Sequence, residues 1–221
     1  MRLEFEDIIR EKAPGLTVAL ITADVSNGET TESLWQEIVE CAESLKSSMA
    51  IEMVNKRPAI AATRLAYKAF GKDPNRYRPS AEALTRRAVK GMELYRTLAI
   101  IDLINLVSLN TGHSIGAFDA DRIEGDTLTL GVGRENEPYQ AIGRGVLNIA
   151  GLPVWRDSVG GVGTPTSDNE RTKLSTDTQH LVVTVNCYCD TPSAEQTAAH
   201  ITDLLKKYAQ ATNIEIHIFK P

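Results

Sequence analysis

The pattern of apolar and polar residues predicts a chain that begins with a strand, continues through helices and returns to strands. The apolar, β-branched segment 16–25 predicts the first strand. Apolar residues at helical spacing then predict four helices, at residues 31–49, 58–70, 80–90 and 97–111. Short strands separated by turns are expected at residues 127–132, 139–142, 146–149 and 154–156. The last elements expected are a strand, an amphipathic helix and a strand, at residues 180–189, 192–208 and 214–219.

Capping residues mark the starts of several of these helices. Thr30 or Thr31 can cap the first helix, and Ser80 is the expected N-cap of the third. Thr191 caps the last helix, with Pro192 in its first turn. Helices and strands are largely segregated along the chain, which predicts an α+β fold rather than a doubly wound sheet.

Charge is distributed unevenly over the 221 residues, although the formal net charge is only −5. Residues 56–96 contain eleven basic and three acidic side chains, a net charge of +8, which indicates an anionic partner. The cations that cluster most closely among tyrosines are Arg76, Arg78, Arg86, Arg87 and Lys90. Such side chains neutralise phosphates and stack on unpaired bases, as RNA requires. The other interpretation is a solvated face whose cations pair with the acidic remainder of the protein.

Composition excludes several classes of protein. Apolar residues make up 42% and charged residues 24% of the chain, as in ordinary globular proteins. No apolar run reaches the roughly 20 residues that cross a bilayer. The first 12 residues lack the apolar region of a secretory signal, so we expect a cytoplasmic protein. The three cysteines form no C-x-x-C pair and no histidine has a catalytic-triad context, so neither a metal nor a cofactor is expected.

Two segments place polar side chains in unusual surroundings. Asp102, Asn105 and Ser108 recur every three residues on an otherwise apolar helix, where they share about one third of its circumference. They either hydrogen-bond to neighbouring backbone or border a ligand pocket. Segment 158–172 is rich in glycine and hydroxyl groups, and is either a surface loop of tight turns or a ligand-binding loop. Its spacing matches neither a P-loop nor a dinucleotide-binding motif.

Residues 76–91 and 99–143 resemble the B3/B4 domain, the editing domain of the phenylalanyl-tRNA synthetase beta subunit, which also occurs as free-standing proteins. The positions that match the family pattern are Ser80, Glu82, Arg86, Arg87, Lys90, Gly91, Asp102, Asn105, Ser108, Leu109, Gly112, Gly116, Asp119, Asp121 and Gly125. Segments 155–158 and 171–173 resemble the family's closing segment, so the resemblance covers roughly residues 70–190. Gly116 stands where the synthetase has a histidine, and Ser114 where the family has a proline.

The resemblance implies a B3/B4-like fold with a mixed β-sheet core and flanking helices. It also implies hydrolysis of a misacylated aminoacyl ester at the 3′ end of tRNA, with water positioned by the substrate's ribose hydroxyls and by backbone and polar groups. We expect residues 1–70 to form an α/β extension on a B3/B4-like domain at 71–221, in one compact unit. No aminoacylation core is present, so the expected activity is editing in trans.

On this resemblance, the expected catalytic residues are Asp168, Thr166 and Ser167, which orient the amino acid or the water. The expected substrate-binding residues are Asn105, His113, Ser114, Gly116, Phe118, Gly160, Gly161, Gly163, Thr164 and Arg171. The expected phosphate contacts are the five clustered cations, Arg76, Arg78, Arg86, Arg87 and Lys90. The alternative function is a non-catalytic module that binds tRNA, another RNA or an amino acid.

Overall fold

The computed structural model describes residues 1–221 and combines strands with α-helices and short 3-10 helices. The helices are α1 (Asp7–Lys12), α2 (Glu32–Ser48), α3 (Pro58–Ala69), α4 (Ser80–Val89), α5 (Ala99–Thr111) and α6 (Ala194–Tyr208). The 3-10 helices are η1 (Ile51–Lys56), η2 (Ala120–Arg122) and η3 (Glu170–Thr172). The strands are β1 (Arg2–Phe5), β2 (Thr17–Asp24), β3 (Ile115–Asp119), β4 (Thr127–Val132), β5 (Gln140–Ala141), β6 (Gly145–Val146), β7 (Pro153–Arg156), β8 (Gly161–Gly163), β9 (His180–Cys187) and β10 (Thr212–Phe219). The predicted α+β class is confirmed.

Two four-stranded sheets form the β core. The first has the order β10-β2-β9-β3 and is antiparallel throughout. The second has the order β1-β4-β7-β8, with β1 parallel to β4 and the other pairs antiparallel. Strands β5 and β6 form a separate small hairpin. The expected mixed β-sheet core is therefore present in the second sheet.

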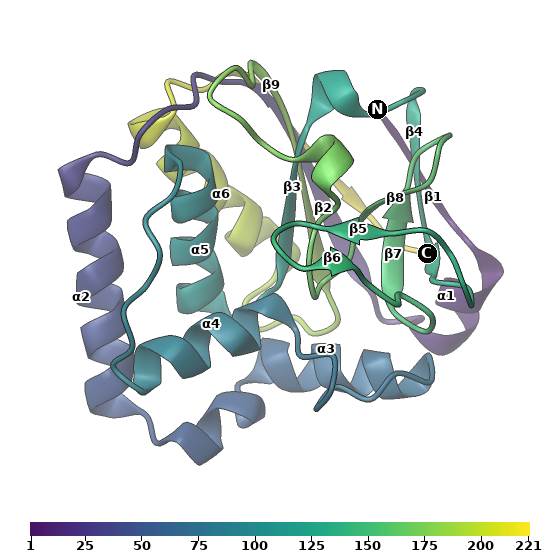
Figure 1. The fold of residues 1–221 in the computed structure, drawn as a ribbon, viewed down its shortest axis with the longest axis horizontal. Helices are drawn as coiled ribbons and strands as arrows, with labels where there is room; N and C mark the ends of the chain where they lie inside the picture. The colour runs from purple at the N-terminus through teal and green to yellow at the C-terminus, as the bar shows by residue number, and fades with distance from the viewer.

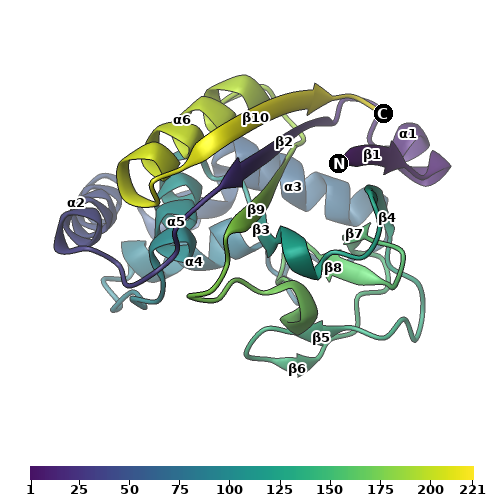
Figure 2. The same ribbon diagram turned by 90° about the horizontal axis from the view of Figure 1, so that it is seen from above.

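The elements stack in three layers, with the first sheet in the middle (Figures 1 and 2). Helices α2, α5 and α6 lie on one face of that sheet and the second sheet lies on the other. Along β2, Ala19 and Ile21 face the helices, whereas Val18 and Leu20 face the second sheet. Both faces of the strand are buried, which explains why residues 16–25 are apolar without alternation.

The sequence places most helices correctly because their ends carry local signals. The Thr31 hydroxyl caps α2 by accepting a 3.3 Å hydrogen bond from the backbone N–H of Leu34. Helix α5 is buried on nearly all sides and ends at Gly112, whose φ of +83° is the left-handed conformation that glycine adopts easily. Strand β2 contributes the N-terminal part of the first sheet, between β9 and β10 from the C-terminal part.

Two predicted caps are wrong. Ser80 is the first residue of α4 rather than its N-cap, and its backbone N–H donates to the carbonyl of Pro165 at 2.7 Å. Helix α6 begins after Ser193, not at Thr191: the Ser193 hydroxyl accepts from the N–H of Gln196, and the Gln196 side chain bonds back to the Ser193 N–H. Such a reciprocal capping box satisfies two backbone donors, which a threonine before proline at this point does not.

Strands that lack a strong β pattern escaped prediction. Strand β3 contains Gly116 and Ala117, and β8 is Gly161–Gly163, so neither carries the branched side chains that mark strands locally. Strand β1 and the short helix α1 were also not predicted. The expected strands at 139–142 and 146–149 shorten to the two-residue strands β5 and β6. Strands β1 and β3 pair with β4 and β9, which are distant in the sequence, so local patterns do not mark them.

Candidate functional site

A cavity of about 350 Å³ lies between the helical layer and the loop that follows β8. One wall is apolar, formed by Leu84, Ile101, Ile104, Ile115, Ala117, Ile142 and Leu174. The other lining residues are polar: Ser80, Asn105, Ser108, Arg144, Thr164, Thr166, Ser167, Asp168 and Lys173. The three residues expected to be catalytic therefore line one cavity together. A mixed lining of this size suits a small ligand that has an apolar part and a polar part.

The loop from Thr164 to Asp168, hereafter the cavity loop, is held by its own side chains. The Thr164 hydroxyl accepts hydrogen bonds from the backbone N–H groups of Thr166 and Ser167, at 3.2 and 3.1 Å. It also donates to the Ser167 carbonyl at 3.0 Å. The Thr166 hydroxyl lies 2.9 Å from the phenol oxygen of Tyr67, which is fully buried in α3. These bonds occupy the Thr164 and Thr166 hydroxyls and fix the loop on the scaffold, so the loop residues that line the cavity are held in a defined arrangement.

Asp168 supplies the only carboxylate that lines the cavity. Its Oδ2 accepts a long hydrogen bond, 3.4 Å, from the backbone N–H of Ala117 in β3. Burial raises the pKa of Asp168 to about 7, and the Ala117 hydrogen bond opposes this shift. The carboxyl is thus able to exchange a proton near neutral pH, which is the property of a general base.

The polar stripe of α5 serves both of the purposes that its sequence left open. Asp102 is buried, and its carboxylate accepts from the hydroxyls of Thr30 and Thr97, at 2.5 and 2.7 Å. Asn105 and Ser108, one and two helical turns further on, line the cavity. One end of the stripe therefore anchors the helix, and the other end borders the pocket.

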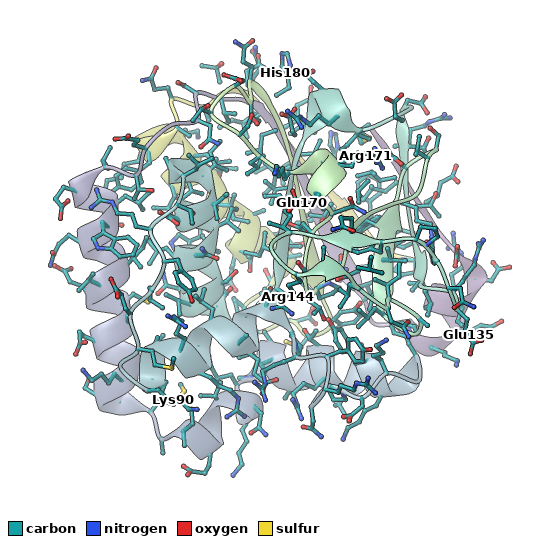
Figure 3. The ribbon with its side chains drawn as sticks, viewed as in Figure 1. Lys90, Glu135, Arg144, Glu170, Arg171 and His180 are labelled. Carbon is teal, nitrogen blue, oxygen red and sulfur yellow. The ribbon has the colours of Figure 1, made fainter.

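Two cations at the cavity were not among the expected site residues. Arg144 follows the short strand β5, is exposed, and has no carboxylate partner. Lys173 lies after η3, where its Nζ is 2.7 Å from Glu170. Figure 3 labels Arg144 and Glu170 in the middle of the molecule, away from Lys90 at its lower edge. Lys173 belongs to the segment that resembles the family's closing motif, which was a usable signal, whereas no local pattern indicates Arg144.

Several expected substrate-binding residues lie away from this cavity. His113 is fully buried, with Nε2 3.0 Å from the Pro192 carbonyl, and burial lowers its pKa. The Gly160 N–H donates to Asp157, and Arg171 forms a 2.8 Å ion pair with the same carboxylate. Arg171 and Gly160 therefore stabilise the loop before β8, rather than facing the cavity.

Three of the expected glycines pack against aromatic rings, two of them against the expected site residue Phe118. The buried Phe118 ring fills the space where side chains of Gly116 and Gly163 would be: an added Cβ would lie 2.7 and 2.5 Å from its Cζ. A Cβ on Gly161 would lie 2.8 Å from the ring of Tyr139. None of these glycines has a positive φ. Their role is close packing of β3 and β8 against aromatic rings, not a left-handed turn.

A small space behind the cavity loop is lined by the expected site residues Ser114, Gly116, Phe118 and Gly163. It has a volume of about 10 Å³ and shares Thr164 and Asp168 with the main cavity. The Ser114 hydroxyl is already engaged, since it accepts from the backbone N–H of Ala81 at 3.2 Å. These residues thus form a second layer behind Asp168.

The basic segment is partly neutralised inside the protein. Glu82, whose side chain is 1% exposed, pairs with Arg64 at 2.8 Å, Arg86 at 2.9 Å and Arg78 at 3.6 Å. These cations hold α3, α4 and the intervening loop together. Other members of the group remain available to solvent: Arg76 and Lys90 are exposed and have no carboxylate partner.

Arg87 is held by its own neighbourhood. Its guanidinium lies 4.3 Å from the Tyr95 ring centroid and bonds to the Glu93 carbonyl.

No group of three or more His, Cys, Asp or Glu side chains is arranged to hold a metal ion. None of the helices has the length and apolar character that crossing a bilayer requires.

Comparisons with known proteins identify the family. Residues 62–214 match the B3/4 domain, while a search of curated proteins gives no match. Among solved structures, the chain is similar to an N-terminal fragment of the phenylalanyl-tRNA synthetase beta subunit from Pyrococcus horikoshii, with 13% identity and a TM-score of 0.49. That match covers 97% of this chain and 50% of the other, so this chain spans half the length of the fragment. The family match takes in every element that lines the cavity, and the chain belongs to the B3/4 domain family.

Proposed function

We propose that this chain binds the aminoacylated 3′ end of tRNA and hydrolyses a misacylated ester in trans, in the cytoplasm. The observation that carries the proposal is the lone carboxylate of Asp168 in a partly apolar cavity, with a pKa of about 7. The resemblance of residues 76–91 and 99–143 to an editing domain supports the same reaction. Hydrolysis of an activated ester needs a general base for water, and Asp168 fits that role.

The reaction proceeds by attack of water on the ester carbonyl. Asp168 accepts a proton from the water, and the water oxygen bonds to the carbonyl carbon of the ester. The bond between the carbonyl carbon and the ribose oxygen then breaks, the ribose oxygen takes the proton from Asp168 to become a hydroxyl, and the free amino acid leaves. Ser167 carries the hydroxyl with the fewest commitments in the cavity loop, its only bond being 3.4 Å to the Asp168 carbonyl. It is the hydroxyl that orients the substrate.

The cavity lining divides the substrate into two parts. The isoleucines and leucines of α4, α5 and β3 receive the amino acid side chain, because they exclude water from it. Asn105 and Ser108 add hydrogen-bonding groups that select for its polar atoms. Arg144 and Lys173 meet the ribose and phosphate of the terminal nucleotide.

The remainder of the tRNA is contacted by cations that have no carboxylate partner within the fold. Arg76 and Lys90 are exposed, whereas Arg86 is committed to the buried Glu82. Lys90→Ala and Arg76→Ala should weaken tRNA binding and reduce its salt dependence without loss of stability. Arg86→Ala should mainly destabilise the protein. A variant that loses tRNA binding but not stability identifies a phosphate contact, and a variant that loses stability identifies a structural arginine.

The first experiment follows release of amino acids from a panel of mischarged tRNAs. We expect turnover on at least one member, and a loss of about 100-fold or more in kcat for Asp168→Asn. Asp203→Asn, on the exposed face of α6, is the matched control and should keep full activity. The rate for the unmodified chain should rise with pH, pass half of its maximum near pH 7 and level off at higher pH, as Asp168 loses its proton.

Three outcomes count against the proposal in different ways. Binding of tRNA without turnover on any substrate would make the chain a binding module. Turnover that Asp168→Asn leaves unchanged would remove this carboxylate from the reaction. If the assays detect no turnover and no tRNA binding, aminoacyl-tRNA is excluded as the ligand of the cavity.

A further inference from the structure

Strand β10 forms an uncovered edge of the first sheet. It pairs with β2 on one side, in a register that sets Ile216 opposite Ile21, and has no strand on its other side. No turn or loop of the chain forms a backbone hydrogen bond with residues 212–219. Figure 2 shows β10 along the rim of the molecule, beside α6. The outer row of its backbone N–H and C=O groups is therefore free to pair with another strand.

Residues 215–219 of this edge carry few of the features that usually prevent pairing, and the lysine and proline nearest to them, Lys220 and Pro221, follow the end of the strand. Monomeric proteins protect exposed edges with lysine, proline or inward-pointing charges. Strand β10 contains neither lysine nor proline, and its central Ile216 is 43% exposed. Its one irregularity is a register shift between Thr212 and Glu215, so residues 215–219 form a regular edge.

The side chains of β10 are complementary to a second copy of the same strand. Ile214, Ile216 and Ile218 alternate on the face toward α6, where the first and last pack against the core. Glu215 and His217 lie on the opposite face, with His217 Nε2 3.5 Å from Glu215 Oε2. The strand thus has one apolar face and one face that carries both an acid and an imidazole.

Only one antiparallel register between two copies uses both faces. When the two-fold axis passes through Ile216, Glu215 of each copy stands opposite His217 of the other. A register centred on Glu215 would oppose two carboxylates, and one centred on His217 would oppose two imidazoles. Opposite charges across a strand pair stabilise it and like charges destabilise it, so the Ile216 register is favoured.

We propose that two copies of this chain associate through their β10 strands, antiparallel and centred on Ile216, into one continuous eight-stranded sheet. A closed two-fold pairing removes the free edge from both copies. The contact consists of one strand pair and a short row of isoleucines. Such an interface is smaller than those of obligate dimers, so the dimer is reversible and depends on protein concentration.

Sedimentation equilibrium over a range of concentrations of the full chain tests the association. We expect a monomer–dimer equilibrium, and Ile216→Lys should raise the dimer dissociation constant by about tenfold or more, since two lysines would meet at the axis. Val159→Lys is the matched control, because Val159 is 66% exposed in the loop before β8. A monomer at every concentration, or a dimer that Ile216→Lys does not weaken, would overturn the proposal.

Two further variants test the register. Glu215→Lys alone should weaken the dimer, and adding His217→Glu should restore it by re-forming opposite charges across the axis. In oxidising conditions Ile216→Cys should form a disulfide between copies, whereas Ile214→Cys should not, because residue 214 lies two positions away from the two-fold axis. Equal cross-linking of both cysteine variants would contradict the register, and with it the proposed mode of association.

Discussion

The ring of Phe118 occupies the space where a side chain of Gly163 would be, so that an added Cβ would lie 2.5 Å from the ring and 2.8 Å from Asp168 Oδ1. One glycine therefore allows β3, β8 and the candidate base to come together. We expect Gly163→Ala to lower the free energy of unfolding by about 1–3 kcal/mol through overpacking, measured by urea denaturation. Gly160→Ala, where a Cβ meets nothing within 4 Å, should change it by less than about 0.5 kcal/mol. Equal effects of the two variants would show that Phe118 moves aside freely.

The hydroxyl of Tyr67 is buried and bonds to Thr166 in the cavity loop. Tyr67→Phe keeps the ring but leaves the Thr166 hydroxyl without this partner, so unfolding should become easier by about 0.5–1.5 kcal/mol. Tyr95→Phe, at a position 71% exposed, is the control and should have no measurable effect. Hydrogen exchange of the Thr166 and Ser167 amides should quicken in the first variant only. Unchanged exchange would mean that Thr164 alone holds the loop.

The carboxyl of Asp168 makes stability depend on pH. Burial raises its pKa from 3.8 to about 7, so between these values the unfolded chain has released a proton that the folded chain still holds. Stability conferred at low pH is therefore lost as pH rises toward 7. The free energy of unfolding of Asp168→Asn, taken relative to that of the unmodified chain, should rise by on the order of 2 kcal/mol between pH 4 and pH 7, measured by denaturation at both values. A difference that does not change with pH would contradict the raised pKa.

Glu82 is the single anion among three arginines, and its side chain is almost fully buried. Glu82→Gln removes the charge that compensates Arg64 and Arg86, so we expect a loss of about 3–5 kcal/mol in stability. Glu135→Gln, at an exposed site in the loop after β4 and at the right-hand side of the molecule in Figure 3, should have almost no effect. Thermal denaturation of the two variants checks this. Equal melting temperatures of the two variants would mean that water, rather than Glu82, stabilises the positive charges of the arginines.

The proposed division at residue 70 is tested by deletion. Strand β2 supplies the middle of the first sheet, so a fragment of residues 71–221 would lose the strand that joins β9 to β10. We therefore propose one cooperative unit and expect that the fragment does not fold, as measured by circular dichroism. A folded, soluble fragment would instead make residues 1–70 a separate extension.

The sequence alone determined those features whose causes are local. The sequence limited the cap of α2 to Thr30 or Thr31, of which Thr31 is the cap, and Gly112 ends α5 because it adopts a positive φ without strain. Helix and strand segregation gave the α+β class, and the motif from Ser80 to Gly125 indicated the family that residues 62–214 match. Segment 158–172, which contains the cavity loop, also stood out by composition, because glycine, threonine and serine gather there.

Tertiary structure decided which residues share a site, because their partners lie far away in the chain. Strand β3 forms only because β9 offers its edge, and Asp168 acquires its raised pKa only because distant elements exclude water from it. Arg86 carries the same charge as Lys90 in the sequence, yet the buried Glu82 takes up one and leaves the other in solvent. Burial and ion pairing depend on the packing of whole layers, so no local pattern encodes them.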